Sequence, residues 1–150
     1  MSELSDLYQE VILDHNRQPH NYHAMPEATR KAEGYNPLCG DQITVYLKLD
    51  GDKIKDVSFE GKGCAISKAS ASVMTDEVKG KTPLEADTLF EKFRELVTQS
   101  KEDQPELEDL GRLAVFAGVS EFPARVKCAT LAWHTLHSAL EAKKGVIATE

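Results

Sequence analysis

The chain has 150 residues, with 18 lysines and arginines against 25 aspartates and glutamates, and its formal net charge is −7. With 41% hydrophobic and 29% charged residues, its composition is that of a soluble globular domain and excludes collagen-like, disordered and membrane-spanning classes. The acidic balance argues against nucleic acid as a partner, because proteins that bind the phosphate backbone present clustered basic residues. The first residues carry neither the basic nor the apolar region of a signal peptide, so we expect a single domain (1–150) located in the cytoplasm.

The first half of the chain predicts one helix and three strands. Apolar residues between Leu4 and His15 recur at three-and-four spacing, which is typical of an amphipathic helix. The polar stretch 18–34 shows no period and is interpreted as an extended loop. Beyond it the period changes to two, and glycine-containing turns separate the apolar segments. We expect three antiparallel strands at 42–49, 54–59 and 61–64.

The second half predicts helices, which supply the cover that a three-stranded sheet needs on one face. Thr82 and Glu85 form the pattern of a capping box, with Pro83 at the first helical position. The acidic stretch 99–109 is interpreted as an exposed, solvated connection. Four helices are expected: 67–78, one from Pro83 past Leu96, a short one around 110–116 that ends at Gly118, and one from Pro123 to Leu140 whose apolar stripe begins at Phe122. The fold class is therefore α+β: a small three-stranded antiparallel sheet covered by about five helices.

Three cysteines, Cys39, Cys64 and Cys128, are the residues most informative about function. An odd number without a secretion signal does not suggest disulfides, and in a reducing cytosol metal binding or catalysis is the expected use. Cys39 precedes a strand in the step Cys39-Gly40-Asp41, whereas Cys64 lies where a helix begins and the helix dipole favours its thiolate. Cys128 lies in the first turns of the last helix. Three thiolates and the Asp41 carboxylate would complete a tetrahedral zinc site.

The cysteine pattern by itself leaves alternatives open. Free cysteines are commonly buried as small apolar side chains, so three scattered ones can simply belong to the core. The histidines are weaker candidates for metal ligands. His15 is expected to interact with the C-terminus of its helix, while His134 and His137 are expected to divide between a packed and a solvated position.

Three segments of the sequence resemble one known family. They are Asn36-Pro37-Leu38-Cys39-Gly40-Asp41, Gly61-Lys62-Gly63-Cys64-Ala65-Ile66-Ser67 and Arg125-Val126-Lys127-Cys128. With Asp14-His15 of the opening helix, they resemble the iron–sulfur assembly family that includes IscU, the N-terminal domain of NifU, and SufU. Two departures from the IscU type are similar to SufU: Lys127 replaces a histidine, and 121–127 departs from the Leu-Pro-Pro-Val-Lys chaperone-recognition segment. The stretch from about 99 to 118 resembles the insertion that distinguishes SufU.

This resemblance implies an activity, a cofactor and partners. It implies a sulfurtransferase that accepts persulfide sulfur from a SufS-type cysteine desulfurase and hands it to a downstream iron–sulfur scaffold. The zinc ligands that it implies are Cys39, Asp41, Cys64 and Cys128. In the family, a histidine of the desulfurase replaces one cysteine on the zinc. We expect Cys39 to be that cysteine and to carry the sulfur, because it lies in a loop while the other two are tied to helix starts.

Two other functions stay open at this point. One is a non-enzymatic scaffold on which a 2Fe–2S cluster is built, and the other is a structural zinc domain without sulfur chemistry. Lys127 favours the sulfurtransferase over the scaffold, because a charged ammonium cannot ligate iron. The length of the chain argues against structural zinc, since a domain of this size folds without metal. Arg125 and Lys127 are expected to contact the partner, because three thiolates and a carboxylate make the site negatively charged.

Overall fold

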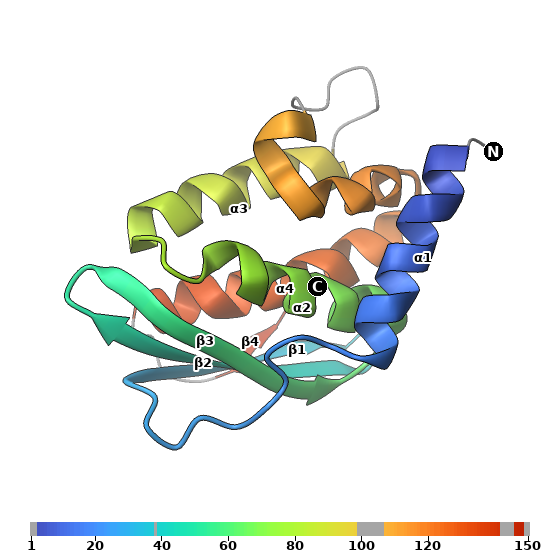
Figure 1. Cartoon of the computed structure of the whole chain (residues 1–150). Coiled ribbons are helices and arrows are strands. Elements are labelled where there is room, and N and C mark those ends of the chain that lie inside the picture. The colour runs from blue at the N-terminus through green and yellow to red at the C-terminus, as the bar shows by residue number, and fades with distance from the viewer. Residues whose placement is uncertain (1–2, 38, 99–106, 142–145, 149–150) are drawn as a thin grey trace.

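The computed structural model describes residues 3–37, 39–98, 107–141 and 146–148. One sheet lies on one side of the molecule, and the helices of the described residues cover its other side (Figure 1). In chain order the elements are α1 (Glu3–Arg17), β1 (Arg30–Asn36), β2 (Asp41–Asp50), β3 (Lys53–Lys62), α2 (Ala65–Val78), α3 (Pro83–Thr98), the 3₁₀ helix η1 (Leu107–Glu121), α4 (Pro123–Leu140) and β4 (Val146–Ala148). None of the helices in these ranges is both long and apolar enough to cross a membrane.

The sheet has the strand order β3-β2-β1-β4, in which β1, β2 and β3 are antiparallel and the short β4 runs parallel to β1. The α+β class and the three antiparallel strands are confirmed, but the third strand was predicted in the wrong place. Residues 61–62 end β3, whereas β1 lies in the stretch interpreted as a loop. The inward positions of β1 are Ala32, Gly34 and Asn36. These residues do not produce the alternation of large apolar side chains that identifies a strand.

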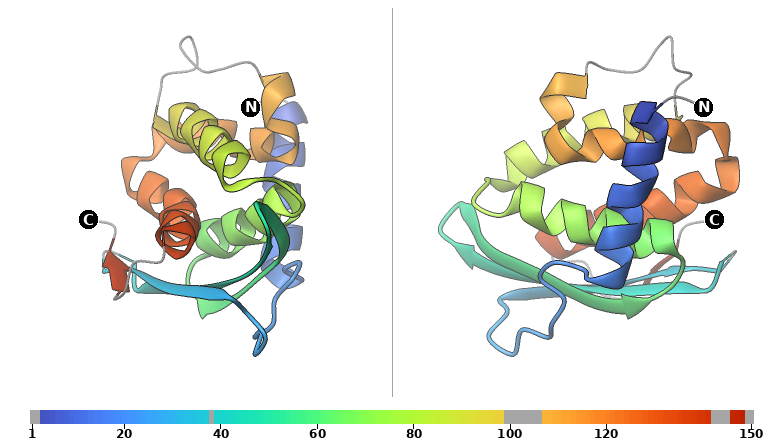
Figure 2. Two further views of the ribbon diagram at one scale, coloured as in Figure 1. Left: turned by 90° about the vertical axis from the view of Figure 1, so that its left-hand side faces the viewer. Right: turned by 45° about the vertical axis from the view of Figure 1, so that its right-hand side comes forward.

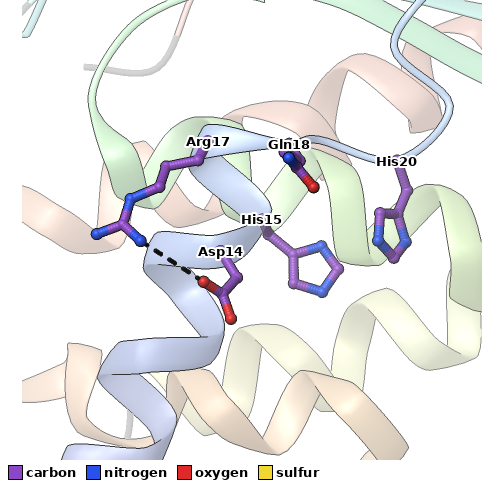
Figure 3. A pocket seen from close by; sticks show the side chains of 5 residues that line it. All are labelled: Asp14, His15, Arg17, Gln18 and His20. Atoms are coloured by element: carbon purple, nitrogen blue, oxygen red, sulfur yellow. Dashed lines mark ion pairs between the residues drawn. The ribbon is translucent and has the colours of Figure 1, made fainter.

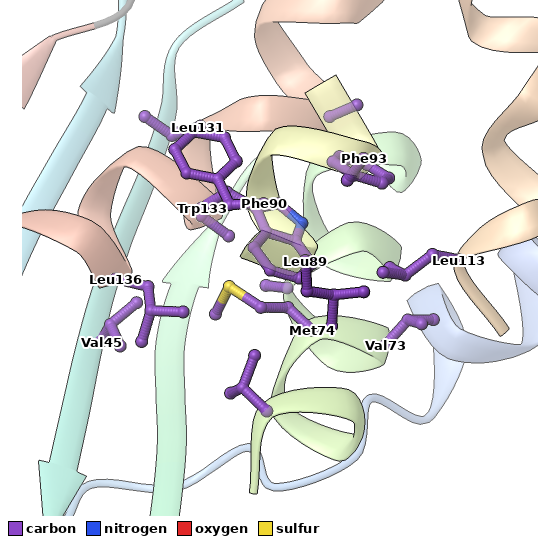
Figure 4. Packing of buried hydrophobic residues seen from close by; sticks show 14 of the residues in the cluster. Val45, Val73, Met74, Leu89, Phe90, Phe93, Leu113, Leu131, Trp133 and Leu136 are labelled. Carbon is purple, nitrogen blue, oxygen red and sulfur yellow. The ribbon is translucent and has the colours of Figure 1, made fainter. Parts of the chain in front are cut away.

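The helices form two layers over the sheet (Figure 2). Helices α2 and α4 pack directly on the strands, and α3 and η1 pack together above them. Figure 4 shows Met74, Phe93 and Trp133 among the side chains of the core. The rings of Phe93 and Trp133 stack with centroids 5.2 Å apart. Because a fully buried large apolar side chain contributes about 1.5–3 kcal/mol, this cluster supports the fold without any metal.

All five predicted helices are present, and α3 begins at the predicted local signal. The Thr82 amide donates to Glu85 Oε1 at 3.0 Å and the Glu85 amide donates to Thr82 Oγ1 at 3.1 Å, which confirms the capping box. Two details of the prediction were wrong. Helix η1 continues past Gly118, and Phe122 is 60% exposed at the N-cap of α4 instead of belonging to its apolar stripe.

His15 fastens α1 to α2. Its Nδ1 atom is 2.7 Å from the Ser72 hydroxyl, which also accepts the backbone N–H of His20. Burial lowers the pKa of His15 and thereby favours its neutral ring. Figure 3 shows the rings of His15 and His20 beside each other in a cavity of about 420 Å³ at the end of α1. His15 therefore joins two helices, in addition to lying in the last turn of α1.

Gly34 brings α4 close to β1. A Cβ atom at this position would lie 2.0 Å from Thr135 Oγ1 and 3.1 Å from Leu131 Cδ1 on α4. Thr135 has little freedom to move, because its hydroxyl donates to the Leu131 carbonyl at 2.8 Å. The absence of a side chain at Gly34 therefore sets the distance between α4 and the strand that leads to Cys39.

We expect Gly34→Ala to lower the free energy of unfolding by about 1–3 kcal/mol, because the added methyl group overpacks the contact between β1 and α4. Chemical denaturation followed by circular dichroism measures this change. The control is Gly118→Ala, since a Cβ at Gly118 meets no atom within 4 Å. Equal stability of the two variants would contradict the role assigned to this contact.

Candidate metal and thiol site

Cys39 lies on a tight turn between β1 and β2. The Gly40 amide donates to the Asn36 carbonyl at 2.8 Å and closes the turn. Gly40 has a φ of 73°, a conformation that glycine adopts without strain. Across the turn, Asn36 and Asp41 are directly paired in the ladder. The turn leaves the Cys39 side chain exposed and places Asp41 in the interior.

Asp41 is a buried carboxylate with a hydrogen-bond donor on each oxygen. Its side chain is 0% exposed. The Cys64 amide donates to Oδ1 at 2.8 Å, and Asn36 Nδ2 donates to Oδ2 at 3.2 Å. Gly63 provides the space for this arrangement, since a Cβ there would lie 2.3 Å from Asp41 Oδ1. A buried charge needs such partners, and each carboxylate oxygen retains a lone pair for a cation.

Cys128 projects from the second turn of α4 toward the β1–β2 turn. Its Sγ atom is 3.4 Å from Cys39 Sγ and 3.5 Å from Asn36 Nδ2. Ligand atoms of Cys39, Asp41 and Cys128 all lie within 4.8 Å of one another. Sulfur ligands of a tetrahedral zinc ion are about 3.8 Å apart, given Zn–S bonds of about 2.3 Å. The spacing and the donor types of these three residues therefore fit a zinc ion.

Cys64 borders this group at the N-cap of α2. Its Sγ accepts the Ser67 amide N–H at 3.4 Å. A hydrogen bond with Cys128, together with that amide, lowers the pKa of Cys64 to about 6 despite its partial burial. The same bond with Cys64 raises the pKa of Cys128, and burial raises it further. The structure thus brings together three of the four predicted ligands, and the fourth, Cys64, is joined to Asp41 through its backbone amide.

The two predicted partner-contact residues lie near the start of α4. Arg125 is exposed, and Lys127 is half-buried. Arg125 and the exposed Phe122 line a largely apolar groove of about 520 Å³ between α1, α2, η1 and α4. Ala65 and Ile66, which follow Cys64, line the same groove. The groove therefore passes next to the cysteine at the N-cap of α2.

The other two histidines considered from the sequence make no contact with the cysteines. His134 packs edge-on against Phe90, and burial lowers its pKa. His137 Nδ1 lies 3.0 Å from Asp87 Oδ1, and its Nε2 lies 2.8 Å from Glu141 Oε1. Both histidines are half-buried, so the expected division into a packed and a solvated residue stays a prediction.

Sequence reasoning did not identify Asn36 or Gly63 as part of the site. Both belong to the segments quoted for the family resemblance, but their roles depend on the pairing of strands. Had β1 been recognised as the partner of β2, the register would have placed Asn36 opposite Asp41. For Gly63 the signal was its position immediately before a helix-capping cysteine.

Comparisons with known proteins agree on one family. The family model for the NifU-like N-terminal domain matches residues 7–142. An iron–sulfur cluster assembly scaffold protein IscU of Streptococcus pyogenes is 43% identical over 94% of this chain and 87% of its own length. A zinc-dependent sulfurtransferase SufU of Bacillus subtilis is 42% identical over 96% of each chain. The crystal structure of a cluster assembly scaffold protein for the SUF system, FiSufU from Fervidobacterium islandicum, superimposes with a TM-score of 0.81 at 39% identity, covering 87% of this chain and 94% of that one.

We expect Gly63→Ala to weaken zinc binding by about tenfold or more, which is the usual effect of disturbing groups that orient metal ligands. The added methyl group would displace the Asp41 carboxylate from the Cys64 amide. Competition with a chromophoric chelator measures the zinc dissociation constant, with Gly118→Ala as the control. Unchanged affinity in Gly63→Ala would show that the orientation of Asp41 does not matter for the metal.

Proposed function

The chain belongs to the NifU-like N-terminal domain family of iron–sulfur cluster assembly proteins, and from this premise we propose that it is a zinc-dependent sulfurtransferase. In this proposal it accepts persulfide sulfur from a SufS-type cysteine desulfurase and passes it to a downstream iron–sulfur scaffold. Cys39, Asp41, Cys64 and Cys128 hold the zinc, and Cys39 carries the sulfur. The similarity to a zinc-dependent sulfurtransferase over nearly the whole chain supports this assignment.

One observation carries the proposal: an exposed thiol touches a buried cluster of metal-binding groups. Cys39 is exposed on its turn, whereas Cys128 and Asp41 are fully buried. A structural zinc site has no need of an exposed ligand on a tight turn. A site that exchanges sulfur with another protein does need one, because the donor persulfide must reach the accepting sulfur.

The chemistry requires a thiolate and a leaving group. The Cys39 thiolate attacks the terminal sulfur of the donor persulfide, R–S–SH. A new S–S bond forms on Cys39, the old S–S bond breaks, and its electron pair leaves with the donor cysteine as a thiolate. Bound zinc would keep the cluster's thiols deprotonated at neutral pH. No external oxidant or reductant is needed, since the sulfur moves between two thiols at the same oxidation level.

The partner surface is proposed to lie at the groove beside Cys64. Its apolar lining and the exposed Phe122 can bury apolar surface of a desulfurase, and Arg125 supplies a positive charge at its edge. Lys127 lies two residues farther along α4. The three free cysteines support a cytoplasmic location, where thiols stay reduced.

The second candidate function is a scaffold for a 2Fe–2S cluster, which the names of the IscU relatives favour. The same thiols could ligate iron, so the two functions differ in the metal that the protein holds. The domain assignment stays a prediction: a single domain with a SufU-type insertion at about 99–118. Residues 99–106 lie outside the described residues, and 107–118 belong to η1.

We expect sulfur to accumulate on Cys39 when the protein is incubated briefly with a SufS-type desulfurase and cysteine. Mass spectrometry of peptides locates the added mass of one sulfur atom. Cys39→Ser should lose both this adduct and the stimulation of the desulfurase, because the accepting thiolate is absent. Sulfur found mainly on Cys64 or Cys128, with Cys39→Ser still stimulating turnover, would contradict the assignment.

Metal analysis of the same preparations separates the two candidate functions. The sulfurtransferase contains one zinc per chain and has no visible chromophore, since zinc is d¹⁰. Iron and sulfide in place of zinc, with absorption in the visible range, would instead support the scaffold.

A further inference from the structure

We propose that Asn36 is a positioning residue that anchors Asp41 and Cys128 and thereby leaves Cys39 as the exchangeable sulfur of the cluster. This inference rests on the proposed function, because it explains which of the zinc ligands can be released to accept sulfur. It concerns the side chain that connects the strand β1 with the helix α4.

Asn36 contacts three parts of the site at once. Its side chain is 0% exposed at the end of β1. The Nδ2 atom is 3.2 Å from Asp41 Oδ2 and 3.5 Å from Cys128 Sγ. A primary amide carries two hydrogens, so it can serve both acceptors. Its backbone carbonyl accepts the Gly40 amide and closes the turn that presents Cys39.

The N–H donors are distributed unequally over the three sulfurs. Cys128 receives the Asn36 amide, and Cys64 receives the Ser67 backbone amide. Among the residues that the structure describes, Cys39 Sγ contacts the Cys128 thiol and no N–H group. An N–H···S bond stabilises a thiolate and reduces its nucleophilicity. Cys39 therefore combines exposure with a sulfur that accepts no N–H bond from the described residues, whereas Asn36 restrains Cys128.

Asn36 also fixes the carboxylate ligand. Asp41 has no contact with solvent; Asn36 Nδ2 donates to its Oδ2 and the Cys64 amide donates to its Oδ1. Loss of the Asn36 amide would leave Oδ2 without this donor and free the carboxylate to turn. In this way one side chain holds two ligands in place, while the ligand on the adjacent turn stays accessible.

A purely structural role must be distinguished from this one, and Asn21 offers a matched control. Asn21 Nδ2 donates to Thr75 Oγ1 at 2.9 Å and to Asp76 Oδ1 at 3.1 Å. It therefore bridges a carboxylate and a second acceptor as Asn36 does, but both acceptors lie on α2 and neither is a cysteine. Asn36→Asp and Asn21→Asp each remove two N–H donors and place a second carboxylate beside an aspartate.

The experiment compares Asn36→Asp, Asn36→Ala and Asn21→Asp with the unaltered protein in two measurements that need no desulfurase. The first is the zinc dissociation constant, by competition with a chromophoric chelator. The second is the ratio of alkylation at Cys39 to that at Cys128 in the zinc-loaded protein, by mass spectrometry after limiting iodoacetamide. We expect both Asn36 variants to weaken zinc binding by about tenfold or more and to lower the alkylation ratio about fivefold. Asn21→Asp should change neither.

A third measurement uses the unaltered protein and does not depend on whether a variant folds. Addition of zinc should shift the side-chain amide signals of Asn36 in a ¹⁵N–¹H spectrum and leave those of Asn21 in place. Wild-type affinity and alkylation ratio in Asn36→Ala, or an Asn36 amide that does not respond to zinc, would overturn the inference. A protein that binds no zinc would overturn it as well.

Failure of this inference and failure of the proposed function give different results. If sulfur reaches Cys39 but Asn36→Ala behaves like the unaltered protein, the positioning role is wrong and the sulfurtransferase stands. If the Asn36 variants change zinc affinity and alkylation as expected but no sulfur reaches Cys39, the positioning role stands and the sulfurtransferase is wrong.

Discussion

The close contact between β1 and α4 is the constraint on which the cysteine cluster depends. Gly34 has no side chain, so Thr135 and Leu131 of α4 can rest directly on the strand. The same helix carries Cys128, whose sulfur must come within contact of Cys39 on the adjoining turn. A wider separation would remove Cys128 from the group while leaving every ligand present in the sequence. The site is therefore set by backbone proximity, and the ligand residues alone do not define it.

A second dependence links the candidate metal ligand Asp41 to the backbone of the next helix. Asp41 starts β2, and its Oδ1 atom accepts the amide of Cys64 at the N-cap of α2. The carboxylate thus has two roles: it is a candidate ligand for the metal, and it accepts the hydrogen bond that holds the Cys64 segment in place. The lowered pKa of Cys64 and the raised pKa of Cys128 both follow from the hydrogen bond between them.

The sequence was informative wherever periodicity or capping determined the structure. The five helices, the strands β2 and β3, and the capping box at Thr82 follow from local patterns, because large apolar side chains mark the buried positions. The strand β1 could not be recognised, since its buried positions are Ala32, Gly34 and Asn36. The small size of these residues is required by the packing of α4 against β1, which is a tertiary contact that the local sequence pattern does not reveal. The role of Asn36 was hidden for the same reason, because it follows from a register that needs β1.

The separation of the core from the cluster explains how a ligand could be exchanged without unfolding. The largest fully buried side chains, among them Trp133, Phe93 and Met74, pack between the sheet and the outer helices. Cys39 contributes nothing to that core, because it is exposed on a five-residue turn closed by the Asn36 carbonyl. Asp41 and Cys128, in contrast, are fully buried. An exposed turn outside the core suits the sulfur-carrying role proposed for Cys39, because the buried side chains that stabilise the fold need not move with it.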